Sequence, residues 1–246
     1  MSYSNYRTSN PAFSGYIWDR SGQTKSRMSF FGLFYKSLIS LGLLGASLWY
    51  VWDLVEQGVN VKWYTSGGIL AAIVFSILTS YRKRWAPVTA PLYALSKGIF
   101  LGGFSAIINK QFNGYPTQAV FITVITFLVI LLLYQLRIIR VTRRFMNVIY
   151  TATFTIMMLY LLSWILSFFN IYNGLVWGTS WFAIGFNIIA AVIAALTLLI
   201  DFYYIDKQMG RAPKYMEWVA VWGLLVSLIW LYVEVLRLMR KLAIRF

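Results

Sequence analysis

Four ionisable side chains lie inside apolar stretches of this 246-residue sequence, at Lys36, Lys97, Asp201 and Glu234. A charge near the middle of a bilayer costs roughly 3 kcal/mol, so such residues usually face the protein interior and have a partner. The two carboxylates are the most informative, because the chain has only seven Asp and Glu residues. Lys36 lies near the end of its stretch, where a lysine can extend its ammonium to the interface. We therefore take Asp201 and Glu234 as the candidate functional residues.

Histidine and cysteine are both absent from the chain. Their absence excludes thiolate metal centres, cysteine nucleophiles, the Ser-His-Asp triad and most transition-metal sites. We expect no cofactor, no stable metal site and no enzymatic activity. An intramembrane enzyme would need an Asp–Asp or Ser–Lys site, and the neighbours Ser96 and Lys97 point to different faces of a helix.

The composition predicts an all-α polytopic integral membrane protein. Sixty per cent of the residues are hydrophobic and only 12% are charged, too little polar material to cover a soluble domain. A polar tail, residues 1–29, precedes a transmembrane domain, residues 30–246. Seven apolar runs near the spanning length of about 20 residues occur in that domain: Phe30–Trp52, Tyr64–Ser80, Val88–Asn109, Ala119–Leu136, Val148–Phe169, Trp181–Ile205 and Trp218–Leu242. Period-2 alternation is missing, which argues against a membrane β-barrel.

The formal charge of +15 is distributed unevenly between the links. Basic links alternate with nearly neutral ones up to the last run, which predicts a multi-pass plasma-membrane protein with a cytoplasmic N-terminus. This placement favours a lipid bilayer, and not nucleic acid, as the partner of the basic residues. The C-terminal cations break the alternation: Arg237, Arg240, Lys241 and Arg245. Either the preference of basic residues for the cytoplasmic side is overridden at the last run, or that run does not cross the membrane as one simple span.

Depth limits how the two carboxylates can be partnered. Asp201 lies about 6 Å before the end of the sixth run, and Glu234 lies about 24 Å after the start of the seventh run, which crosses the membrane in the opposite direction. In straight helices the two carboxylates would therefore differ by about 18 Å in membrane depth. The candidate charged partners are Arg82, Glu217 and Asp206 for Asp201, and Lys97 for Glu234. A second carboxylate beside Asp201 would titrate together with it, whereas Arg82 would form a breakable latch.

Several strings appear in a specific order relative to the apolar runs. They are Asn10–Phe13, Ala90–Leu95 with Gly98 and Gly102, Ile139–Thr142, Asp201–Ile205, Ala212–Trp218 and Trp230–Leu238. Together they resemble the Bax inhibitor-1 family, specifically its bacterial YccA-like branch. The resemblance implies seven transmembrane helices, six of them wrapped around the C-terminal helix.

The resemblance also implies a pH-sensitive calcium leak, gated by acids on the last two helices. By position, Asp201 matches the acid of the sixth helix, and Arg82 matches a basic residue that can latch it. Glu234 is the carboxylate of the seventh-helix string, although Ser227 or Ile229 could occupy the equivalent level. Position 97, where this branch tends to carry an acid, is a lysine in this chain.

The leading hypothesis is therefore a proton-sensitive cation leak in which Asp201 and Glu234 supply a weak, transient calcium site. The alternative is a membrane scaffold or stress-response regulator that acts through protein or lipid partners without transport. The GxxxG spacing of Gly98 and Gly102 predicts close packing between helices of the same chain.

Overall fold

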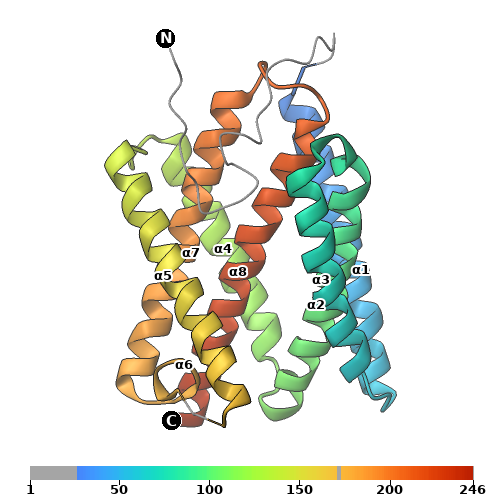
Figure 1. Cartoon of the computed structure of the whole chain (residues 1–246), viewed down its shortest axis with the longest axis vertical. Coiled ribbons are helices and arrows are strands. Elements are labelled where there is room, and N and C mark those ends of the chain that lie inside the picture. The colour runs from blue at the N-terminus through green and yellow to red at the C-terminus, as the bar shows by residue number, and fades with distance from the viewer. Residues whose placement is uncertain (1–26, 171–172, 246) are drawn as a thin grey trace. The chain divides into compact units, whose positions relative to one another are not determined.

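The computed structural model describes residues 27–170 and 173–245, and these residues are almost entirely helical (Figure 1). The α-helices are α1 (Phe30–Glu56), α2 (Lys62–Tyr81), α3 (Ala86–Gln111), α4 (Tyr115–Gln135), α5 (Arg143–Phe168), α6 (Gly174–Trp177), α7 (Trp181–Gln208) and α8 (Met216–Arg245), with a 3₁₀ turn, η2 (Lys83–Trp85), before α3. By length and composition, seven helices of the described part could cross a membrane. The predicted all-α polytopic class is confirmed.

Each predicted run lies within or nearly within one long helix. The two shortest runs extend at their ends to give α2, with 20 residues, and α4, with 21 residues. At 1.5 Å per residue, both helices reach the hydrocarbon thickness of about 30 Å. The last run is one unbroken helix, α8, of 30 residues. The short helix α6 was not predicted, because four residues are too few to give a periodic pattern.

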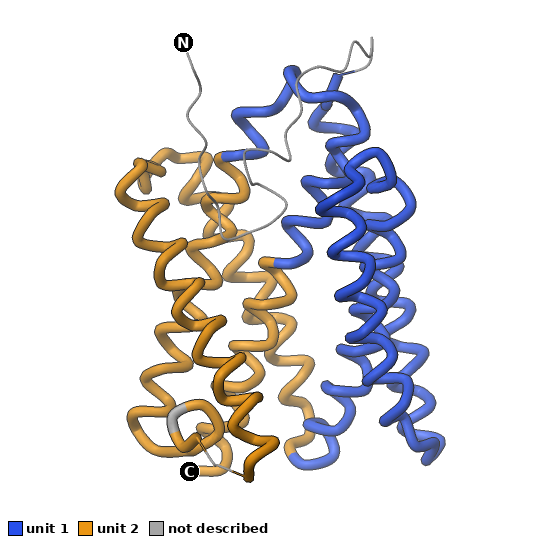
Figure 2. The backbone as a smooth tube through the Cα atoms, in the orientation of Figure 1, with its two compact units in different colours: residues 1–111, 204–226 blue, residues 112–203, 227–246 orange. Residues whose placement is uncertain are grey.

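The chain divides into two compact units (Figure 2). Unit 1 contains residues 1–111 and 204–226, and unit 2 contains residues 112–203 and 227–246. Helices α7 and α8 contribute residues to both units, so the single transmembrane domain predicted over residues 30–246 has an internal division that the hydropathy pattern did not indicate.

In unit 1, α3 packs against both α1 and α2 (Figure 1), and glycines of α3 allow the close approach. A Cβ atom at Gly98 would overlap Ser47 Oγ and the Leu44 carbonyl of α1, and one at Gly102 would lie 2.5 Å from the Leu48 carbonyl. Glycine therefore permits a backbone approach that any larger residue would block. The predicted role of this GxxxG pair in packing within the chain is confirmed.

The end of the predicted tail is built into unit 1. Arg27 forms an antiparallel bridge with Pro213, and Met28 is 2% exposed and bonded through its backbone to Gly210 and Ala212. Ser29 then caps α1, its side chain accepting a hydrogen bond from the Gly32 amide. Residues 27–29 thus form an ordered strap, and the remainder of the predicted tail lies outside the described residues.

In unit 2, aromatic pairs join the long helices. Phe202 of α7 contacts Phe127 of α4 at 5.4 Å between ring centroids, and Phe186 of α7 contacts Tyr160 of α5 at 5.8 Å. Such edge-on arrangements of rings are favourable beyond the area that they bury. These contacts fix α7 beside α4 near one end and beside α5 near the other.

The helices differ in how much of their surface is buried. In the most apolar window of α8, 72% of the residues are buried, compared with 22% in α5 and 17% in α4. The 72% value of α8 is what a helix with protein neighbours on most sides would have. The arrangement of six helices around α8 stays a prediction.

Candidate functional site

Glu234 is the centre of a buried polar network in unit 2. Its Oε2 accepts hydrogen bonds from the Tyr160 hydroxyl at 2.7 Å and from Asn187 Nδ2 at 2.9 Å. Its Oε1 accepts a hydrogen bond from Trp230 Nε1 at 3.1 Å and lies 3.6 Å from Arg237 NH1. The carboxylate therefore joins α5, α7 and α8, and Arg237 supplies its counter-charge.

Helical spacing explains the part of this network that α8 contributes. Trp230, Glu234 and Arg237 are separated by four and three residues, which places them on one face of the helix. The Arg237 guanidinium also lies 4.5 Å from the ring centroid of Tyr160, a cation–π distance. Glu234 is 0% exposed, so its carboxylate is itself removed from solvent.

Asn187 completes the network from α7. This residue is 1% exposed, and its Oδ1 has no hydrogen-bond partner among the described residues. A buried carbonyl oxygen with an unused lone pair is an acceptor for a proton donor or a cation. The network thus presents one free acceptor beside a carboxylate whose two oxygens are both engaged.

Asp201 is buried on α7, as expected for a candidate functional residue, but it does not lie at the level of Glu234. The α7 residue that binds Glu234 is Asn187, which precedes Asp201 by 14 residues, or about 21 Å along the helix. This value agrees with the predicted depth difference of about 18 Å. Because calcium ligands lie roughly 2.5 Å from the ion, one calcium ion cannot bind both carboxylates in this arrangement.

A second buried carboxylate, Glu217, forms a separate cluster in unit 1. Its Oε1 accepts hydrogen bonds from the Ser29 backbone amide at 2.8 Å and the Ser29 hydroxyl at 3.2 Å, and its Oε2 pairs with Lys36 Nζ. The Lys36 ammonium pairs with Glu217, donates to the Lys214 carbonyl just before α8 and lies 5.3 Å from the Trp218 ring centroid, and its extension to the interface stays a prediction. This pair could not be predicted from local sequence patterns, because its members are 181 positions apart.

The other predicted site residues have contacts of their own. Arg82 is exposed at the end of α2, 5.8 Å from the Trp85 ring centroid, and it lines a basic cavity of about 420 Å³ with Lys83 and Arg84. Lys97, proposed as a partner of Glu234, belongs to unit 1 and lies 5.9 Å and 5.5 Å from the ring centroids of Tyr93 and Phe100. Asp206 is exposed near the end of α7.

Three of the C-terminal cations that break the charge alternation have partners in unit 2. Arg237 pairs with Glu234, and Lys241 Nζ donates to the Ala183 carbonyl at 3.1 Å. Arg245 donates to the Thr179 carbonyl at 2.9 Å, and its guanidinium lies 4.0 Å from the Trp181 ring centroid. Lys241 and Arg245 therefore join the end of α8 to the start of α7.

Sequence reasoning missed Tyr160, Asn187, Trp230 and Arg237 as members of the site. Two sequence features could have predicted part of this site. Trp230 and Arg237 have helical spacing around Glu234, and Asn187 is a polar residue inside the apolar run Trp181–Ile205. Tyr160 gave no comparable signal. Among the described residues, no group of three or more His, Cys, Asp or Glu side chains could hold a metal ion.

The sequence model of the Bax inhibitor 1 like family matches residues 10–244. This chain belongs to the Bax inhibitor 1 like family. Membership agrees with the seven spanning helices and is compatible with the bacterial YccA-like branch. No curated protein and no solved structure gives a match. The chain is therefore a multi-pass membrane protein of this family.

Proposed function

We propose that this Bax inhibitor 1 like protein is a proton-responsive cation leak, with calcium as a permeant ion and Glu234 as the group that responds to protons. The observation that carries the proposal is the position of Glu234. It is a fully buried carboxylate on a membrane-spanning helix, and three helices of unit 2 meet at it. Buried ionisable residues within membrane spans mark ion and proton pathways by default.

Protonation would change every contact of Glu234. An ionised carboxylate only accepts hydrogen bonds, whereas a protonated one donates one and has less capacity to accept. The charged groups around it are Arg237 and Lys241 of α8, with Tyr160 facing it from α5 and the uncharged Asn187 from α7. Neutralising Glu234 leaves Arg237 without its counter-charge, and hydrogen bonds to a charged group are worth about 1.5–3 kcal/mol each. Acid therefore loosens the ties between α8 and the helices α5 and α7.

Asp201 is a second group on the same pathway, about 21 Å along α7 from the level of Glu234. Two carboxylates at different depths would act in sequence, each offering weak oxygen ligands to a passing ion. In this proposal Arg82 keeps the latching role that the family resemblance gives it. The protein lies in the plasma membrane with a cytoplasmic N-terminus, as the alternation of basic and neutral links indicates.

The test is calcium flux into proteoliposomes that contain the full chain, measured between pH 5 and pH 8. Wild-type flux is expected to rise severalfold as the pH falls. Glu234→Gln keeps the shape of the side chain but removes its charge, so its flux at pH 8 should equal the acid flux of the wild type. Asp201→Asn should lower the flux at every pH.

The matched control is Glu56→Gln. Glu56 also accepts a hydrogen bond from a tryptophan four residues earlier, Trp52 Nε1 at 2.7 Å, but it is exposed at the end of α1. This variant should retain the wild-type pH profile. A pH profile that is unchanged in Glu234→Gln, or altered equally in Glu56→Gln, would contradict the role of Glu234.

A scaffold without transport is the second candidate function. It is favoured by the engagement of both Glu234 oxygens with side-chain donors, an arrangement that suits a structural tie as well as a gate. The same flux assay separates the two functions. A folded wild-type protein with no flux above empty vesicles at any pH would favour the scaffold.

A further inference from the structure

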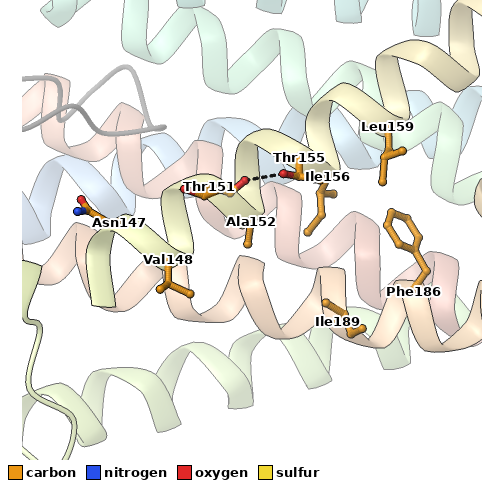
Figure 3. A pocket seen from close by; sticks show the side chains of 9 residues that line it. All are labelled: Asn147, Val148, Thr151, Ala152, Thr155, Ile156, Leu159, Phe186 and Ile189. Carbon is orange, nitrogen blue, oxygen red and sulfur yellow. Dashed lines mark hydrogen bonds between the residues drawn. The ribbon is translucent and has the colours of Figure 1, made fainter. Parts of the chain in front are cut away.

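An open groove runs along unit 2 between α5 and α7 (Figure 3). Its α5 wall extends from Asn147 to Leu159, and Phe186 and Ile189 of α7 form the opposite wall. The volume is about 580 Å³, within the range of about 300–1,000 Å³ that is usual for sites binding small molecules. None of these residues belongs to the Glu234 network.

Short side chains on α5 make this surface concave. Thr151, Ala152 and Thr155 lie between the larger residues of the wall. The Thr155 hydroxyl donates to the Thr151 carbonyl at 2.9 Å, shown as the dashed line in Figure 3, so this polar group is satisfied within its own helix. The groove therefore offers a largely apolar floor although threonines line it.

The length of the groove matches one leaflet of a bilayer. Asn147 and Leu159 are 12 residues apart, or about 18 Å along α5, and half of the hydrocarbon core is about 15 Å thick. Val148 is 65% exposed and Ile189 is 60% exposed, so the groove is open along its side. An extended acyl chain lying parallel to α5 fits these dimensions.

The two ends of the groove differ in charge. Arg143 and Arg144 precede Asn147 and Val148 by one helical turn, so they continue the stripe of α5 residues that lines the groove. Both arginines are exposed. At the opposite end, Leu159 and Phe186 are apolar, and Phe186 packs on the Tyr160 ring. A ligand that complements this groove has an anionic head and an apolar tail.

We propose that the groove binds one anionic phospholipid from the leaflet that faces Arg143 and Arg144. The two guanidinium groups bind its phosphate, and one acyl chain lies in the groove as far as Leu159 and Phe186. Arginine suits this role because its planar fork donates two hydrogen bonds to a phosphate. The bound chain contacts Phe186, the residue that packs against the Tyr160 ligand of Glu234.

Native mass spectrometry of the full chain tests this site. The protein in detergent micelles is titrated with phosphatidylglycerol or phosphatidylcholine, and the fraction with one bound lipid is measured. Wild type should bind phosphatidylglycerol more tightly. Replacing both arginines, Arg143→Gln with Arg144→Gln, should weaken this binding about 25-fold, or about fivefold for each basic residue. The double variant Arg143→Lys with Arg144→Lys keeps both charges and should lose much less affinity for phosphatidylglycerol.

Two controls distinguish the groove from diffuse attraction. Arg137→Gln with Arg140→Gln removes the same charge from the preceding link and should leave the bound fraction nearly unchanged. Ala152→Trp fills the groove and should abolish tight binding, whereas Met157→Trp, at an exposed residue outside the groove, should not. Size-exclusion profiles show which variants remain folded.

Equal losses in the two arginine pairs, or full binding in folded Ala152→Trp, would overturn the proposal. Adding inorganic phosphate at millimolar concentration tests whether the site binds a free phosphate ion and not a lipid. Phosphate should not displace the lipid, because the acyl chain supplies part of the affinity, and displacement would assign the site to phosphate alone. These outcomes do not depend on calcium flux, so the lipid site stands or fails separately from the proposed leak.

Discussion

Replacing Lys36 by methionine should destabilise the protein through Glu217. The Glu217 side chain is 0% exposed and that of Lys36 is 14% exposed, so the substitution leaves a buried carboxylate without its cation. Removing one member of a buried ion pair costs roughly 3–5 kcal/mol. Two hydrogen bonds from Ser29 remain on Glu217, and Lys36 is not fully buried. We therefore expect a loss of about 2–3 kcal/mol in the free energy of unfolding.

A double-mutant cycle separates the pair from its surroundings. Glu217→Gln keeps the acceptor for the Ser29 amide and leaves a lysine that can still reach water, so it should cost about 1–2 kcal/mol. The double variant removes both charges and should be about as stable as Glu217→Gln alone. The resulting coupling energy is about 2 kcal/mol, within the usual range for residues in contact.

Unfolding by sodium dodecyl sulfate in mixed micelles, followed by tryptophan fluorescence, measures these free energies. Lys62→Met, at an exposed lysine of the same unit, is the control and should change stability by less than about 0.5 kcal/mol. Additive effects of the two substitutions, or a Lys36→Met variant as stable as the control, would refute the argument that this pair holds the start of α1 to the start of α8.

Three further predictions test the packing, the capping and the orientation of the helices. Gly98→Ala should cost about 1–3 kcal/mol because its Cβ overlaps α1, whereas Gly45→Ala, with open space around it, should be neutral or stabilising in the same unfolding assay. Thr142→Ala removes the hydroxyl that accepts from the Phe145 amide at the start of α5 and should cost about 1 kcal/mol; a loss below about 0.3 kcal/mol would contradict this cap. Since the chain has no cysteine, single cysteines at positions 84 and 140 should react with an impermeant maleimide only in opened cells, and those at 60 and 113 in intact cells; the reverse pattern would invert the topology.

Hydropathy was sufficient to predict the fold class, because a long apolar run is enough to indicate a spanning helix. The backbone N–H and C=O groups of such a helix bond to one another, so no partner from elsewhere in the chain is needed. The helix ends were less predictable. Amphipathic residues such as Lys62 and Tyr115 extend α2 and α4 beyond their apolar cores. The strap at residues 27–29 could not be predicted from local pattern, since its backbone partners, Gly210 and Ala212, lie more than 180 residues away.

The scarcity of acids identified the important carboxylates but not their partners. Glu234 was predicted as a site residue because it lies inside an apolar run, and its depth along that run separated it from Asp201. Depth also made Lys97 the expected partner of Glu234, since among charged residues Lys97 is nearest to it in depth. The structure instead surrounds Glu234 with neutral donors from Tyr160, Asn187 and Trp230 and with one cation from its own helix. Rotation about a helix axis decides such contacts, and depth along the axis does not.

Glu217 and Glu234 show how similar chemistry on α8 can serve different purposes. Each carboxylate is fully buried, and each binds one cation together with neutral donors. The cation of Glu217 comes from α1, so losing the charge separates two parts of unit 1 that are distant in sequence. The cation of Glu234 comes from α8 itself, so the contacts of Glu234 with other helices are the hydrogen bonds from Tyr160 and Asn187, and no ion pair ties it to another helix. Substitutions at Glu217 should therefore change stability first, and substitutions at Glu234 should change the pH response of a protein that remains folded.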